Sequence, residues 1–180
     1  MKELGKKFEK LYDVIKRLRD PKDGCPWDIK QTHQSIRENF IEETYEAIEA
    51  IDNNDEESLK EELGDVLLHV LFHSDISERG DSFDIGDVID GITQKLIRRH
   101  PHVFSDTTVS GTEEVLKNWE IIKKEEKSEK QNKGVDKISL LDGIPMNMPA
   151  LITAQRIQQR AARIGFDWDS PEPVWDKIYE

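Results

Sequence analysis

Apolar residues recur every three or four positions through much of this chain, which is the spacing of amphipathic helices. The first such stretch, over residues 3–19, has its apolar positions at Leu4, Phe8, Leu11, Ile15 and Leu18. Two prolines and a glycine within the next seven residues prevent the stretch from continuing as a helix. Alternation with a period of two, as expected for half-buried strands, is nowhere sustained. The pattern therefore predicts an all-α protein.

Polar capping residues mark where the next helices begin. The predicted first residues or caps are Thr32, Asp55, Asp84 and Thr112. The first three of these helices are expected to end near residues 52, 78 and 99. Because only a short turn at residues 53–55 separates the first two, we expect them to form an antiparallel hairpin. The predicted fold is a helical bundle built around this hairpin.

The charge pattern changes near residue 125 and predicts a domain boundary there. Residues 125–136 are rich in lysine and glutamate and lack an apolar anchor until Val135, which is typical of a frayed helix end followed by a linker. We therefore expect a helical domain over residues 1–126, a charged linker over residues 127–138 and a helical tail over residues 139–180.

Five carboxylates lie on the two helices of the predicted hairpin. At about 100° per residue, Glu42, Glu43 and Glu46 fall within about 100° of one another on the first helix, and Glu62 and Asp65 lie about 60° apart on the second. If the hairpin brings the two groups together, their like charges repel unless cations hold them. The pattern predicts a divalent-metal site, against the ordinary alternative of a solvated acidic face.

The third helix favours the metal site over the solvated face. Asp65 lies within an otherwise apolar stretch, residues 63–72, where a buried and unpaired aspartate is strongly disfavoured. Gly64 costs about 1 kcal/mol in a helix relative to alanine, so we expect another backbone to approach it closely. His69 and His73 follow Asp65 by one and two turns and are expected to be core residues or to lie behind the metal ligands.

The available donors limit the kind of metal. Oxygen ligands select hard cations, so Mg²⁺ is expected, with Mn²⁺ as a substitute. Cys25 is the only cysteine, which excludes a cysteine-based zinc cluster and an intrachain disulfide. A di-iron bundle is the other carboxylate centre to consider, but its Glu-x-x-His pattern does not occur in this sequence.

Basic and aromatic residues outside the hairpin are candidates for substrate binding. Lys95 and Arg99 lie one turn apart, which suits either a polyphosphate clamp or a solvated basic helix end. Trp119 and Lys123 repeat this spacing, and the tryptophan is expected either to stack on a base or to fill the core. Trp27, just before the acidic helix, is expected to line a ligand pocket or to act as a hydrophobic plug.

Charge and hydropathy limit the classes of partner. The net charge is −12, from 26 basic and 38 acidic residues, and this opposes binding to nucleic acid through its phosphates. No apolar run approaches the roughly 18 residues of a membrane span, and the first ten residues lack the apolar stretch of a secretory signal. We expect a cytoplasmic protein that binds neither nucleic acid nor membrane.

Five motifs in order carry a resemblance that covers about residues 15–125. They are Leu18-Arg19-Asp20-Pro21 with Gly24-Cys25-Pro26-Trp27-Asp28 and Gln31-Thr32-His33, then Glu42-Glu43-x-x-Glu46, then Glu62-x-x-Asp65, then Arg98-Arg99-His100-Pro101-His102-Val103-Phe104, then Trp119-Glu120. With these motifs the sequence resembles the MazG family of all-α nucleoside triphosphate pyrophosphohydrolases.

The resemblance implies a role for each candidate residue. The Mg²⁺ ligands would be Glu43, Glu46, Glu62 and Asp65. Glu42 would orient or deprotonate the attacking water, and the triphosphate would be held by Lys95, Arg99 and Lys123. The products would be a nucleoside monophosphate and pyrophosphate. The resemblance also implies a homodimer or higher homo-oligomer, because family members usually dimerise.

Three further readings of the function stay open beside general cleansing of the nucleotide pool. Two are relatives specific for one nucleotide, a dUTP or dCTP pyrophosphatase and a phosphoribosyl-ATP pyrophosphatase. The third is a non-catalytic acidic helical module that binds a protein or stores divalent ions. Residues 161–169 and 174–180 look like the opening of the second repeat found in longer family members, so we expect a fragment with one complete unit and one incomplete unit.

Overall fold

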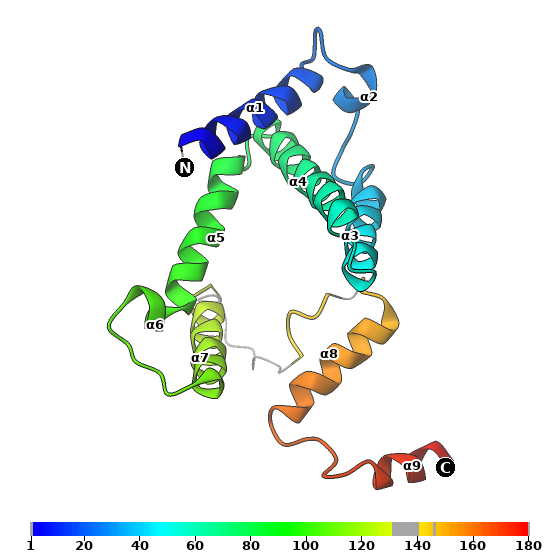
Figure 1. The fold of residues 1–180 in the computed structure, drawn as a ribbon, viewed down its shortest axis with the longest axis vertical. Coiled ribbons are helices and arrows are strands. Elements are labelled where there is room, and N and C mark those ends of the chain that lie inside the picture. The colour runs from blue at the N-terminus through cyan, green and yellow to red at the C-terminus, as the bar shows by residue number, and fades with distance from the viewer. Residues whose placement is uncertain (1, 131–140, 146, 180) are drawn as a thin grey trace. The chain divides into compact units, whose positions relative to one another are not determined.

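The computed structural model describes residues 2–130, 141–145 and 147–179, and within them it contains helices and no strand. The helices are α1 (Lys2–Leu18), α2 (Pro26–Ile29), α3 (Arg37–Asp52), α4 (Glu56–Arg79), α5 (Ile85–Arg99), α6 (Pro101–Phe104), α7 (Thr112–Lys130), α8 (Ala150–Ala162) and α9 (Glu172–Tyr179) (Figure 1). The prediction of an all-α protein is therefore confirmed.

The chain divides into two compact units, Met1–Lys123 and Lys124–Glu180. The first contains α1 to α6 and most of α7, and the second contains α8 and α9. Of the predicted linker, residues 131–138 lie outside the described residues, and α7 continues to Lys130. None of the described helices is long and apolar enough to cross a membrane.

The core of the first unit is centred on α4. Its buried apolar residues are Ile15 on α1, Ile36 just before α3, and Leu71 and Phe72 on α4. The partly buried residues packed against them are Phe8, Leu11, Tyr12, Leu68, Ile76 and Ile85. Because α1, α3 and α5 each pack on α4, this one helix sets the positions of the other three.

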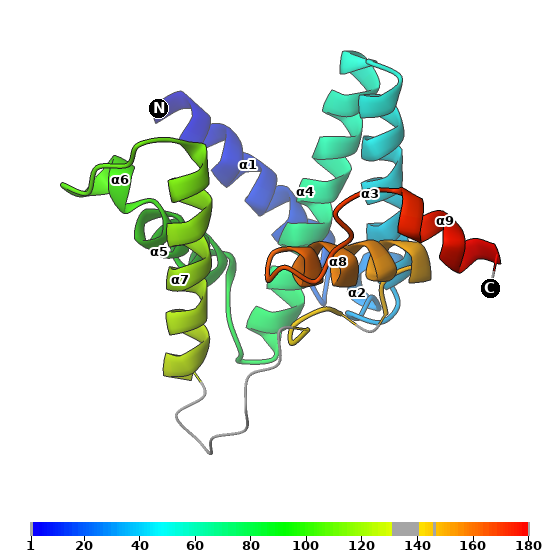
Figure 2. The ribbon, with the colours of Figure 1, turned by 90° about the horizontal axis from the view of Figure 1, so that it is seen from below.

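Helices α3 and α4 lie side by side (Figures 1 and 2). Two small residues on α3, Ala47 and Ala50, are buried, and small side chains permit close approach of the two helices. Asn54 makes the connection with a left-handed φ of 55°, which asparagine tolerates better than most residues. The Asp55 side chain then caps α4 by accepting hydrogen bonds from the backbone N–H groups of Glu57 and Ser58.

Three of the four predicted helix starts are confirmed and one is wrong, and Thr112 is confirmed as the first residue of α7. Asp55 and Asp84 are the N-caps of α4 and α5, and Asp84 forms a capping box with Asp87. Thr32, in contrast, does not cap α3: its side chain accepts a hydrogen bond from the Ser35 backbone within a separate turn, and α3 begins at Arg37. The short helices α2 and α6, which both begin with proline, were not predicted because four residues carry too little periodicity.

Gly24 fixes the tight connection between α1 and α2. A Cβ atom at this position would clash with the carbonyl oxygens of Leu18 and Asp20. The turn is closed by a hydrogen bond of 2.7 Å from the Cys25 N–H to the Leu18 carbonyl. The glycine therefore allows the chain after α1 to fold back toward α4.

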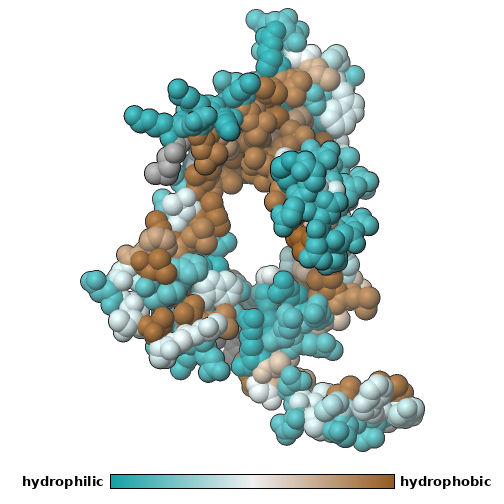
Figure 3. All heavy atoms as spheres, in the orientation of Figure 1, coloured by the Kyte–Doolittle hydropathy of each residue, from teal (hydrophilic) through white to brown (hydrophobic). Residues whose placement is uncertain are grey.

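Several apolar side chains of the first unit remain exposed. On α3, Ile41, Tyr45 and Ile48 are 45–51% exposed and lie three or four residues apart, which places them along one side of the helix. Figure 3 shows further hydrophobic side chains gathered over α1, α4 and the start of α5 on the face in view.

Candidate metal centre

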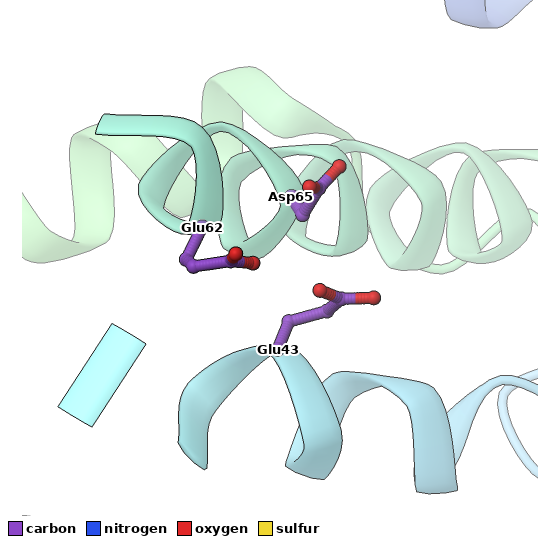
Figure 4. A group of neighbouring side chains, drawn as sticks. All are labelled: Glu43, Glu62 and Asp65. Carbon is purple, nitrogen blue, oxygen red and sulfur yellow. The ribbon is translucent and has the colours of Figure 1, made fainter. Parts of the chain in front are cut away.

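Three carboxylates from α3 and α4 meet in what we call the acidic cluster: Glu43, Glu62 and Asp65. One carboxylate oxygen from each residue lies within 4.8 Å of the others. Figure 4 shows the Glu43 side chain reaching from α3 toward Glu62 and Asp65 on α4. All three residues are partly buried. The sequence expectation that acids of these two helices converge is thus met by these three residues.

The acidic cluster carries negative charge that no basic side chain of the described residues pairs with. Desolvation, together with the charges of Asp65 and Glu46, raises the pKa of Glu43 above its usual range. Desolvation and the charges of Glu46, Glu61 and Asp65 likewise raise the pKa of Glu62. Within the described part of the chain, no lysine or arginine forms an ion pair with Glu43, Glu62 or Asp65.

The geometry of the acidic cluster fits a divalent cation. Hard cations hold oxygen ligands at about 2.0–2.6 Å, so two oxygens on opposite sides of one ion stand up to about 5 Å apart. The measured limit of 4.8 Å falls within that span. A cation would also remove the like-charge repulsion that, after desolvation, contributes to raising the pKa values of Glu43 and Glu62. The donor set, the spacing and the electrostatics agree on a hard divalent ion.

The other two acids predicted on α3 lie outside this group of three. Glu46 is near enough to affect the pKa of both Glu43 and Glu62 through its charge. Glu42 is exposed on α3 and does not belong to the acidic cluster. The structure therefore separates the five predicted acids into three that converge, one neighbour and one exposed residue.

Two sequence expectations about α4 near the acidic cluster are wrong. Asp65 was expected to be buried among apolar side chains, but it is only partly buried, and Leu63 and Leu67 are 54% and 37% exposed. Gly64 was expected to meet another backbone, but a Cβ atom there would find no described atom within 4 Å. The apolar run in the sequence reflects a helix face that the described chain leaves uncovered.

The predicted substrate-binding residues lie on other elements. Lys95 is exposed on α5. Arg99 and Lys123 both lie over the ring of Trp119, with the guanidinium carbon 5.3 Å and the ammonium nitrogen 4.6 Å from the ring centroid. Trp27 is 61% exposed on α2, so its alternative role as a hydrophobic plug is wrong. Trp119 is partly buried, and both cations lie over its ring.

A second charged group on α4, which the sequence did not predict, is paired with basic side chains. The Asp75 carboxylate is completely buried and accepts hydrogen bonds of 2.6 Å from Nε of Arg19 and from Nε of Arg79. Its other oxygen lies 3.3 Å from Nζ of Lys16. We call these four residues the Asp75 cluster. Burial opposes ionisation of Asp75, but the hydrogen bonds from Arg79 and Arg19 outweigh it and lower the pKa.

Imidazole side chains lie between the acidic cluster and the Asp75 cluster along α4. Nδ1 of His33, before α3, is 2.7 Å from Nδ1 of His73. Nε2 of His33 is 3.3 Å from Oγ of Ser77. His69 is 8% exposed, as expected of a core histidine, and its ring stacks on Phe40 with a centroid distance of 5.4 Å. The role of His33 was missed because its partners are at least 40 residues away in the sequence.

Comparison with known proteins identifies the part of the chain that carries this site. Residues 31–104 match the family model described as the MazG nucleotide pyrophosphohydrolase domain. This segment includes the whole acidic cluster. It contains four other candidate residues, Glu42, Glu46, Lys95 and Arg99. It also includes His33 and His73.

Relatives and a solved structure extend the similarity to most of the chain. A nucleoside triphosphate pyrophosphohydrolase of Escherichia coli is 45% identical over 173 residues, which cover 96% of this chain and 64% of that protein. The nucleoside triphosphate pyrophosphohydrolase/pyrophosphatase MazG of Thermotoga maritima is 48% identical over 180 residues, or 66% of its length. The chain thus spans slightly less than two thirds of these curated relatives.

A solved structure is similar to a large part of the chain. The crystal structure of a mazG-related protein from Thermotoga maritima matches with a TM-score of 0.55 and 32% identity. The match covers 64% of this chain and 98% of that one. Fold and sequence comparisons therefore point to the same family.

Proposed function

Because the chain belongs to the MazG family, we propose that it hydrolyses nucleoside triphosphates to a nucleoside monophosphate and pyrophosphate. The observation that carries this proposal is the convergence of Glu43, Glu62 and Asp65 within the segment that matches the family domain. The two curated relatives described above are named for the same activity. The chain spans only part of those relatives, and the proposal concerns this part.

We assign Mg²⁺ to the acidic cluster, with Mn²⁺ as a substitute. Glu43, Glu62 and Asp65 would hold it. Glu46 would be the fourth ligand, and its effect on the pKa values of Glu43 and Glu62 supports this. When bound, Mg²⁺ supplies positive charge that stabilises the phosphate oxygens of the substrate. The fold holds the carboxylates close together, ready to bind the ion. When no ion is bound, their negative charges repel one another.

Glu42 is the candidate general base. It lies next to Glu43 on α3 but is exposed and stands outside the acidic cluster, so its carboxylate is available to accept a proton from water. In the reaction, the water oxygen bonds to the α-phosphorus, Glu42 takes the proton, and the bond from the α-phosphorus to the bridging oxygen breaks. Pyrophosphate leaves with the electron pair of that bond.

The cations of α5 and α7 are candidates for holding the triphosphate. Arg99 and Lys123 each lie over the ring of Trp119, and Lys95 lies one turn before Arg99. Their guanidinium and ammonium groups would stabilise the charge on the leaving pyrophosphate. The aromatic surface for the base would come from Trp119 or from the exposed Trp27.

We also propose that the chain works as a homodimer or higher homo-oligomer. The exposed apolar stripe on α3, formed by Ile41, Tyr45 and Ile48, and the open surface around Gly64 support a partner of the same kind. Such stripes are uncommon on proteins that remain monomeric. The proposed role in the cell is cleansing of the cytoplasmic nucleotide pool, across several common and modified nucleotides.

The direct test is to incubate the protein with a mixture of nucleoside triphosphates and Mg²⁺ and to measure pyrophosphate. We expect pyrophosphate and nucleoside monophosphates in equal amounts, and no product from the Asp65→Asn variant. Release of orthophosphate alone would contradict the proposal. Metal binding without any product would favour the acidic interaction module, and turnover of a single nucleotide would favour a specific relative.

A further inference from the structure

His33 and His73 form a histidine pair that joins the segment before α3 to α4. Their Nδ1 atoms are 2.7 Å apart, and the two rings are nearly parallel, with an interplanar angle of 6°. Nitrogen atoms at this distance need one hydrogen between them, so one ring donates and the other accepts. The pair can hold at most one positive charge, because a second proton would place two N–H groups face to face.

The histidine pair is fixed from several sides. Nε2 of His33 is 3.3 Å from Oγ of Ser77, one turn after His73 on α4. From α3, the Phe40 ring lies against His73 with a centroid distance of 5.8 Å. Three residues after His33, Ile36 is 2% exposed in the core. The pair and this core residue together hold the start of α3 on α4.

The position of the histidine pair connects it to the acidic cluster. Glu43 lies seven residues after Ile36, within the first two turns of α3, whereas Glu62 and Asp65 lie on α4. The distance between Glu43 and the other two acids therefore depends on how the start of α3 is held against α4. Among the described residues, His33 is the only titratable side chain of the segment 31–35 that contacts α4.

We propose that the histidine pair is a clasp that positions the acidic cluster. When both rings carry a positive charge, the hydrogen bond between them is lost, the clasp opens and metal binding weakens. This inference rests on the proposed function, because it takes the acidic cluster as the metal site. His33 and His73 would touch neither metal nor substrate and act only through the placement of α3.

The surroundings of the histidine pair favour its closed form near neutral pH. Desolvation, and the charges of His33 and His69, lower the pKa of His73. Phe40 offers no charge, Ser77 offers a hydroxyl, and Arg19 contacts the Gln31 carbonyl two residues before His33. Asp65 acts on His69. No carboxylate is among the groups that act on His73, so nothing there favours the doubly protonated pair.

The test uses Mn²⁺ titrations of the wild-type protein and three variants between pH 5.5 and 8. His73→Leu cannot form the hydrogen bond, whereas His73→Asn can form it without titrating. His102→Asn removes a histidine on α6 and serves as the control. We expect His73→Leu to bind Mn²⁺ about tenfold more weakly at pH 7.5, a typical loss for a group behind the ligands, and His73→Asn and His102→Asn to bind as the wild type does.

The pH profile separates positioning from a merely structural role. Below pH 6.5 the affinity of the wild type for Mn²⁺ should fall more steeply than that of His73→Asn, because only the wild-type pair can take the second proton. Parallel profiles, or an unchanged affinity in a folded His73→Leu protein, would overturn the clasp. If His73→Leu does not fold, His33→Ala takes its place with the same expected loss. Absence of Mn²⁺ binding in the wild type would overturn the proposed metal site as well, so the two failures are distinguishable.

Discussion

Carboxylates lie toward both ends of α4, three residues in the acidic cluster at one end and Asp75 at the other, and the two sites differ in what surrounds the carboxylates. Toward the N-terminal end, the acidic cluster faces other carboxylates, and the pKa values of Glu43 and Glu62 are raised. Toward the C-terminal end, the buried Asp75 is surrounded by Lys16, Arg19 and Arg79, and its pKa is lowered.

We infer from the comparison that a carboxylate serves structure at one place and, as proposed, ligand binding at the other. In the Asp75 cluster the chain supplies the cations itself, so the charges join α1 to α4 and need nothing from outside. In the acidic cluster the described chain supplies no cation, and the repulsion remains until one binds. A carboxylate with a raised pKa among like charges is therefore the better indicator of function.

Among the variants that keep the metal ligands, the largest effect on activity is expected at Glu42, and it separates an acid that reacts from acids that bind. Glu42→Gln should lower turnover about 10²–10⁴-fold, the usual range for loss of a general base, while Mn²⁺ affinity stays unchanged. Turnover and Mn²⁺ titration on the same preparation check this. A parallel loss of affinity would place Glu42 among the ligands.

Removal of the Asp75 carboxylate should be the largest effect on stability. Asp75→Ala leaves Arg19 buried without its carboxylate, and loss of one partner of a buried pair costs about 3–5 kcal/mol. The free energy of unfolding from urea denaturation measures this. Lys60→Ala is the matched control on the same helix, because it removes the exposed pair with Glu57 and should change stability by less than about 1 kcal/mol. Equal effects would break the comparison.

Lys95 and Arg99 lie outside the hairpin and do not pair with the acidic cluster. Their variants test whether these cations bind the substrate instead. Lys95→Ala or Arg99→Ala should weaken triphosphate affinity about tenfold to a hundredfold, since a charged hydrogen bond contributes roughly 1.5–3 kcal/mol. Monophosphate affinity should stay the same. Arg17→Ala, an exposed arginine on α1, is the control. Equal weakening for both nucleotides would place the two residues near the α-phosphate.

The smallest expected effect is on the stability of the metal-free protein. Asp65→Asn should raise the free energy of unfolding by about 0.5 kcal/mol at pH 7.5, the scale of an exposed like-charge contact. Because the folded pKa values of Glu43 and Glu62 are raised, their repulsion is present above those values and is relieved as the pH falls through them. The difference between variant and wild type should shrink toward pH 5. A growing difference would contradict the assigned repulsion.

Residues with local signals were predicted from the sequence, whereas long-range pairs were not. Asp55 and Asp84 were recognised as caps because each accepts hydrogen bonds from backbone N–H groups only two or three positions later in the sequence. The convergence of Glu43 with Glu62 and Asp65 followed from helix periodicity and one short turn. The prediction of a close backbone contact at Gly64 was wrong, because an apolar run in the sequence does not reveal whether other parts of the described chain cover that helix face.

The Asp75 cluster had no signal in the sequence. Arg19 and Asp75 are 56 residues apart, and each alone is typical of a solvated helix surface. Only the packing of α1 on α4 buries them together. The histidine pair was missed for the same reason, since a hydrogen bond between two histidines has no characteristic spacing. Tertiary contacts between side chains thus determine what periodicity cannot predict.

The most direct test of the central claim, that the acidic cluster needs an external cation, is a calorimetric titration of Mn²⁺ at pH 7. The variants to compare with the wild type are Asp65→Asn and Glu57→Gln, which remove one acid inside and one outside the acidic cluster on the same helix. We predict saturable binding to the wild type and to Glu57→Gln, and at least about tenfold weaker binding to Asp65→Asn. Equal affinities in all three proteins would contradict the account.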